Sequence, residues 1–133
     1  MTSTTFKTKI PSGTYVLGDP CYSLAESASD QFWDGGRVDW KFYDTTIESA
    51  GHGHRAMAFG TAYGDGCFED QHGHKYGVDA GVIGLVPSEL TDPAKLARNF
   101  NWVQVVTFKR AVTCTRSPTG TLKFGPYKIK TGE

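Results

Sequence analysis

Two long runs of β-type residues around one polar turn constrain the fold of this 133-residue chain more than any other feature. The runs cover residues 55–67 and 74–86, and the polar segment Glu69-Asp70-Gln71-His72-Gly73 lies between them. Runs of this length on both sides of such a turn predict an antiparallel β-hairpin. The chain is therefore expected to be built around this hairpin.

The turn also predicts a register, with Asp65 opposite Asp79 and Phe59 opposite Leu85. Since side chains alternate along a strand, the aspartates then share one face with Tyr63, which lies opposite Gly81. The other face carries mainly small residues, from Ala56 to Gly66 on the first strand. Small residues there would let a further layer of the protein approach closely.

The other segments predict short strands and at most two short helices. Ser23, with Glu26 three residues later, predicts a capped helix over residues 23–32. Asp92 followed by Pro93 predicts a second helix that ends near Asn99. Short strands are expected at residues 15–17, 38–43, 102–108, 112–116, 121–124 and 127–130. We therefore expect a single domain over residues 1–133, with a flexible tail over residues 1–10. The expected fold class is mainly β (β-rich α+β), with a strongly bent antiparallel sheet or a small barrel.

Composition and charge narrow the classes of function. No apolar run is long enough to cross a bilayer, and residues 1–10 lack the hydrophobic segment of a secretory signal, so we expect a cytoplasmic protein without a membrane partner. The formal net charge is zero and no basic run occurs, so general nucleic-acid binding is not expected. Residues 100–133 nevertheless carry six Lys/Arg and only Glu133 as an acid. These cations either protect edge strands or form a surface for anions.

Histidines and cysteines offer little support for a metal or a cofactor. All four histidines fall in two pairs, His52/His54 and His72/His74, which the hairpin separates by about 30 Å of strand. The three cysteines, Cys21, Cys67 and Cys114, form no Cys-x-x-Cys pair and are expected to be reduced, unreactive thiols. No nucleotide-binding loop or zinc-protease motif occurs. We therefore expect no metal and no cofactor.

Candidate site residues lie in the hairpin and in the segment Asp19-Pro20-Cys21-Tyr22. Two carboxylates opposed on one sheet face repel each other unless a proton, a cation or a ligand donor intervenes. Alternatively, each aspartate caps a bend through backbone N–H groups. Tyr22, Tyr63, Trp33 and Trp40 offer either stacking planes for a flat ligand or a core aromatic cluster. The predicted ligand-binding residues are Asp19, Tyr22, Tyr63, Asp65 and Asp79.

The segments Gly18-Asp19-Pro20-Cys21-Tyr22, Thr61-Ala62-Tyr63-Gly64-Asp65-Gly66 and Val78-Asp79-Ala80-Gly81-Val82-Ile83-Gly84 are similar to motifs of one group of small proteins. This group consists of uncharacterised phage and bacterial proteins, and the second segment also resembles one in a bacterial domain-of-unknown-function family. The resemblance implies a phage or prokaryotic origin and gives no activity. None of the histidines belongs to these motifs.

Three functions remain open at this stage. The first is a small phage-type binding protein that sequesters a nucleotide-like host signalling molecule. The second is an accessory module that binds a host protein or assembles into a homo-oligomer. The third is a small enzyme that uses Asp65 and Asp79 as an acid/base pair. A binding protein is favoured over an enzyme, and no catalytic residue is assigned.

Overall fold

The computed structural model describes residues 4–132, and in that part of the chain three antiparallel sheets and two short α-helices make a mainly β, α+β fold. One sheet has the strand order β3-β4-β5-β8-β2-β9, a second has the order β1-β10-β11-β12, and β6 and β7 form a hairpin. The six-stranded sheet contains β2 (Gly13–Gly18), β3 (Arg37–Asp39), β4 (Phe42–Ser49), β5 (His52–Gly60), β8 (Val82–Pro87) and β9 (Gln104–Phe108). The four-stranded sheet contains β1 (Phe6–Ile10), β10 (Val112–Arg116), β11 (Thr121–Phe124) and β12 (Tyr127–Lys130). The remaining elements are β6 (Gly66–Glu69), β7 (Lys75–Val78), α1 (Glu26–Trp33), α2 (Pro93–Asn99) and the 3₁₀ helices η1 (Pro20–Tyr22), η2 (Ser88–Leu90) and η3 (Phe100–Trp102).

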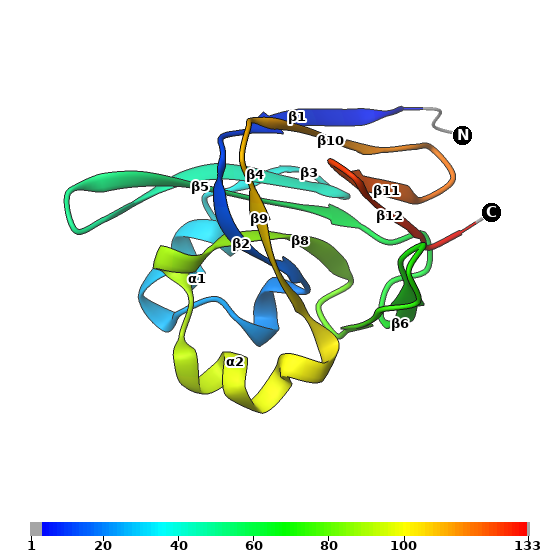
Figure 1. Ribbon diagram of the computed structural model, residues 1–133. Helices are drawn as coiled ribbons and strands as arrows, with labels where there is room; N and C mark the ends of the chain where they lie inside the picture. Colours follow the sequence, from blue (N-terminus) through cyan, green and yellow to red (C-terminus); the bar gives the residue numbers. More distant parts are fainter. Residues whose placement is uncertain (1–3, 133) are drawn as a thin grey trace.

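The six-stranded sheet is the middle layer (Figure 1), with the four-stranded sheet above it and the helices below it. The core between the two sheets includes Phe59, Ile83 and Phe124, all fully buried. On the opposite face, Phe32 of α1 packs in a cluster with the small residues Ala56 and Ala58. The expectation that a small-residue face admits a further layer is therefore confirmed, and α1 is that layer.

The central hairpin is present, but it is divided into two ladders. In β6–β7, Gly66 pairs with Val78, which is the register predicted from the turn. In β5–β8, Phe59 pairs with Ile83 instead of Leu85. Five residues (61–65) leave the ladder on one side and only three (79–81) on the other, so the register shifts by two. A shift of two keeps the side chains of β5 and β8 on their predicted faces, whereas Val78 of β7 packs with Phe59 and Ile83 instead of with Ala56 and Val82.

Two larger expectations were wrong. No sheet in the described chain is closed or strongly curled, because the strands are divided among three sheets joined by turns.

Phe6–Ile10 are not a flexible tail but form β1, which pairs with β10 from Phe6↔Arg116 to Ile10↔Val112. The segment alternates inward and outward residues, a strand pattern that outweighs its position near the terminus. Residues 1–3 of the expected tail lie outside the described residues.

Of the two predicted helix caps, one is confirmed and one was wrong. The Asp92 cap and Pro93 at the first turn of α2 are confirmed, and the Asp92 side chain accepts a hydrogen bond from the Ala94 amide. The Ser23 cap was wrong, because α1 begins at Glu26 after Ala25 and buried Ser23 follows η1. The strand expected at residues 38–43 is interrupted by a turn at Trp40, which leaves the indole 80% exposed.

Candidate functional site

The buried carboxylate of Asp19 joins two of the three motif segments. Asp19 is fully buried and caps η1, where Oδ1 accepts a hydrogen bond from the Cys21 amide at 2.9 Å. Its Oδ2 accepts from the amides of Asp79 at 2.8 Å and Ala80 at 2.7 Å. Burial raises the pKa of Asp19, while the three backbone N–H groups act in the opposite direction. With both oxygens engaged by backbone amides, this predicted ligand residue has a structural role.

The third motif segment, residues 61–66, is hydrogen-bonded to the turn that Asp19 holds. The backbone N–H of buried Thr61 donates to Gly81 O at 3.0 Å, and the Thr61 hydroxyl donates to Gly64 O. Gly64 and Gly81 have φ values of 84° and 85°, which favour glycine. A Cβ on Gly81 would lie 3.7 Å from the Gly64 Cα, so the two turns are in contact. We call the segments 18–22, 61–66 and 78–81 the motif junction.

The other predicted ligand residues also belong to the motif junction, and all but Tyr22 are exposed. Asp65 and Asp79 are exposed and flank the last pair of the β6–β7 ladder, Gly66↔Val78. The predicted cross-strand pair Asp65↔Asp79 is therefore not formed, because both residues lie outside the strands, in the turns next to this last ladder pair. Tyr63 is 72% exposed. Tyr22 is half-buried. Its pKa is raised, first by burial and then by electrostatic interactions with Cys21, Asp79 and Asp19.

Cys21 lies inside the motif junction and is held as a neutral thiol. Burial, and then the charge of Asp19, raises the pKa of Cys21 to about 12. A thiol with such a pKa is protonated at neutral pH and is a poor nucleophile. This agrees with the sequence-based expectation that Cys21 is not catalytic.

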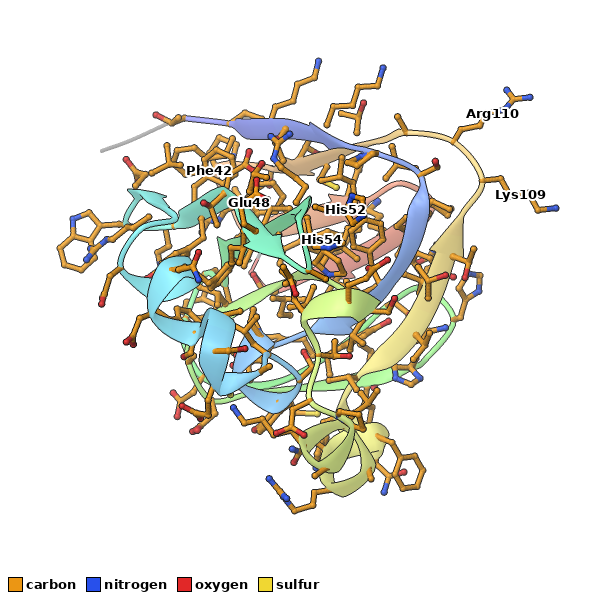
Figure 2. All side chains as sticks on the ribbon, turned by 90° about the vertical axis from the view of Figure 1, so that its left-hand side faces the viewer. Phe42, Glu48, His52, His54, Lys109 and Arg110 are labelled. Carbon is orange, nitrogen blue, oxygen red and sulfur yellow. The ribbon has the colours of Figure 1, made fainter. Side chains whose placement is uncertain are left out.

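The histidine pairs lie at the ends of different hairpins. His52 and His54 belong to the β4–β5 hairpin, as Figure 2 shows. His54 Nδ1 lies 3.8 Å from Glu89 Oε1, beside a cavity of about 170 Å³. His74, at the other hairpin, has its Nε2 3.0 Å from Val103 O. Within residues 4–132 no three His, Cys, Asp or Glu residues are grouped as metal ligands. That the purified protein carries no stoichiometric zinc stays a prediction, which elemental analysis after dialysis tests.

A second cavity, of about 400 Å³, combines aromatic and cationic side chains. It is lined by Thr4, Phe6, Asp39, Trp40, Lys41, Arg116 and Pro118, and we call it the Trp40 cavity. Trp40 comes from the β3–β4 turn, and the Arg37 guanidinium lies 4.8 Å from the centre of its ring. Phe6 stacks on Phe42, with ring centroids 5.5 Å apart.

Backbone carbonyls hold the two cations of this cavity in place. Arg116 Nε donates to Gly60 O at 2.6 Å, and Lys41 Nζ donates to Thr61 O at 2.9 Å. Arg116 Nη1 also donates to Ser117 O at 3.0 Å. No ion pair with a described carboxylate is formed by either cation within 4.0 Å. Arg116 is 6% exposed, and this burial lowers its pKa. The two cations are therefore anchored on the carbonyls of consecutive residues, Gly60 and Thr61.

Sequence reasoning identified Trp40 as a stacking plane but missed Lys41, Arg116 and Phe6. A tryptophan between charged residues, in Asp39-Trp40-Lys41, was the available signal for an exposed aromatic turn. Nothing in the linear order brings Arg116 to this turn, since Gly60 binds it across 56 positions.

No family model, curated protein or solved structure matches the chain. Among the described residues, no helix has the length and apolar character needed to cross a membrane.

Proposed function

We propose that this protein binds a small, flat, anionic ligand of the nucleotide type in the Trp40 cavity and acts by sequestering it. The observation that carries the proposal is the pair Lys41 and Arg116, fixed on the neighbouring carbonyls of Thr61 and Gly60 and not ion-paired with any carboxylate of residues 4–132. Ordered cations next to an exposed indole suit a ligand with both a phosphate and a ring.

Each wall of the cavity has a chemical role in this proposal. The guanidinium of Arg116 and the ammonium of Lys41 bind phosphate oxygens, and partial burial strengthens these contacts relative to water. The Trp40 indole stacks on the ligand ring. The exposed Asp39 carboxylate accepts hydrogen bonds from ring N–H groups. A volume of about 400 Å³ is within the range of small-molecule sites.

Hydrogen bonds connect the motif junction to Lys41 in the wall of this cavity. Asp19 binds the amides of Asp79 and Ala80, the next residue Gly81 accepts from the Thr61 amide, and Thr61 O accepts from Lys41. This continuous chain of hydrogen bonds fixes the Lys41 ammonium relative to the junction. We infer that Asp19 positions the cavity wall. Direct ligand contact by Tyr22, Tyr63, Asp65 and Asp79 stays a separate prediction.

Calorimetric titration with a panel of mononucleotides and cyclic dinucleotides tests the proposal. At least one of them should bind more tightly than about 1 mM. Trp40→Ala and Arg116→Gln should each weaken binding at least about 10-fold, because stacking or a charged hydrogen bond is lost. Phe100→Ala, which removes an exposed aromatic ring from η3, should leave binding unchanged. Unchanged affinity in Trp40→Ala, with wild-type melting, would refute the proposal.

A protein-interaction module is the second candidate, and one observation favours it. Phe100, Trp102 and Val105 are exposed by 65%, 43% and 57%, within η3 and the adjacent edge strand β9. An apolar group of this kind suits a host protein or a second copy of the chain. Val105→Lys should abolish self-association in sedimentation experiments if this surface forms a homo-oligomer. An enzyme acting through Asp65 and Asp79 is least supported, because both carboxylates are exposed.

A further inference from the structure

The outward face of the four-stranded sheet gathers lysines that are far apart in the sequence. Lys7 of β1 lies opposite Thr115 of β10, Thr115 opposite Lys123 of β11, and Lys123 opposite Lys128 of β12. These four residues form one row across all four strands. Lys9 and Lys130 lie two positions along the outer strands, on the same face because side chains alternate. We call these residues the lysine face.

The lysine face is exposed and contains no carboxylate. Its five lysines are exposed, whereas the alternate residues of the same strands, such as Ile10, Cys114 and Leu122, are fully buried in the core. The four strands contain no Asp or Glu, and none of the five lysines forms an ion pair within 4.0 Å with a described carboxylate. These lysines are therefore not ion-paired within the described residues.

Protection of sheet edges does not account for the whole face. Edge strands use lysine to prevent pairing with other chains, and this suffices for Lys7, Lys9, Lys128 and Lys130 on β1 and β12. Lys123 lies on β11, which is paired on both sides, and so protects no edge. Its position completes the row across the sheet.

The zero net charge argued against general nucleic-acid binding, but the charge is unevenly distributed over the surface. In place of that expectation, we propose that the lysine face docks on the phosphate backbone of double-stranded DNA without reading its sequence. Lysine and threonine side chains are common donors to phosphate oxygens, and the face consists of these two residue types. The row from Lys7 to Lys128 spans three strand spacings, about 14 Å. This length is close to the roughly 12 Å width of the major groove of B-form DNA, so lysines at both ends reach opposite backbones.

Other macromolecules fit this face less well. Protein interfaces have apolar or aromatic centres and few lysines, and the outward residues here include neither an apolar nor an aromatic side chain. Single-stranded nucleic acids need aromatic side chains for base stacking. A-form RNA has a narrow major groove, which a flat sheet does not span. The inference uses no residue of the Trp40 cavity and is independent of the small-ligand proposal.

One carboxylate at the rim gives the inference a directional test. Glu69 is exposed and, with Lys128 and Lys130, lines a cavity of about 320 Å³ beside β12. Asp70, in the same cavity, is buried and accepts hydrogen bonds from the His72 and His74 amides. Glu69→Gln should therefore strengthen binding to DNA by removing repulsion from phosphate.

Fluorescence anisotropy with a short DNA duplex, titrated between about 50 and 200 mM salt, tests the proposal. Five phosphate contacts predict a slope of log K against log salt of about −4.5. Lys123→Gln should reduce the magnitude of this slope by about 1, and Lys123→Gln/Lys128→Gln by about 2. The matched control is Arg98→Gln, which removes an exposed charge from α2, on the helical side of the molecule (Figure 1), and should leave the slope unchanged.

Parallel titrations with single-stranded DNA, double-stranded RNA and polyglutamate identify the partner. The duplex DNA should bind most tightly, in the range of about 10⁻⁴ to 10⁻⁶ M. The proposal would be overturned if the protein bound any other partner more tightly than duplex DNA. It would also be overturned if Lys123→Gln and Arg98→Gln lowered the affinity for duplex DNA equally. Failure of the folded wild-type protein to bind the duplex at about 50 mM salt would overturn the proposal as well.

Discussion

The buried carboxylate of Asp19 accepts a hydrogen bond from the backbone amide of Ala80 at 2.7 Å, across 61 positions of the chain. The adjacent amide of Asp79 binds the same oxygen. A single side chain therefore fixes the turn after β7 to the end of β2. Because this turn also holds Thr61 and, through it, Lys41, the relationship connects the motif junction to the Trp40 cavity.

Removal of this carboxylate should destabilise the protein. Asp19→Ala leaves three backbone donors without their acceptor, each at a cost of about 1–3 kcal/mol, so the free energy of unfolding should fall by about 3 kcal/mol or more. Urea denaturation measures the change. Asp30→Ala, at an exposed position of α1, is the matched control and should change stability little. Equal stability of the two variants would show that the Asp19 bonds contribute nothing net.

The protein should lose stability at alkaline pH. Burial raises the pKa of Cys114 and of Cys21 to about 12 from 9.0. Unfolded thiols ionise above pH 9, while the folded ones stay protonated, so the unfolded state is favoured as pH rises through this window. At pH 10 the buried Cys114 thiol should lower the free energy of unfolding by about 1.4 kcal/mol, and the partly exposed Cys21 thiol by less, because solvent screens its interactions.

Thermal melting between pH 7 and 10, compared between wild type and Cys114→Ala, measures this effect. Cys114→Ala should melt lower at pH 7 because it leaves a small cavity, yet lose less stability on going to pH 10. A pH dependence identical to that of wild type would contradict the assignment to Cys114.

Asp65→Asn and Asp79→Asn test direct ligand contact at the motif junction. Both side chains are exposed, so neither substitution should lower the melting temperature. If the carboxylates accept ligand hydrogen bonds, affinity should fall by roughly 10- to 150-fold. Full affinity in both variants would confine the ligand to the Trp40 cavity.

The fold was predictable where the signal was local. The turn at residues 69–73 determined the β6–β7 register, and the Asp92-Pro93 pair determined the start of α2. The side chains of β5 and β8 also lie on the sheet faces that were predicted for them, since the register shift is an even number of residues. Such signals depend only on neighbours in the chain.

The site was less predictable because its contacts are long-range. Asp65 and Asp19 each follow a glycine in the sequence, yet Asp65 is exposed and Asp19 is buried and bound by three amides. The lysine face was predicted only in part, since the cations of residues 100–133 were identified but Lys7 and Lys9 were not. Lys7 and Lys123 become neighbours in one row only through pairing of β1, β10 and β11.

Native mass spectrometry of the protein purified from its host cell tests the central claim most directly, because it detects bound small molecules without a choice of candidates. The account predicts that wild-type protein carries an anionic small molecule with the mass of a nucleotide-type compound, and that Trp40→Ala, equally folded, does not. Wild-type protein at its bare mass, or the same ligand retained by Trp40→Ala, would contradict the account.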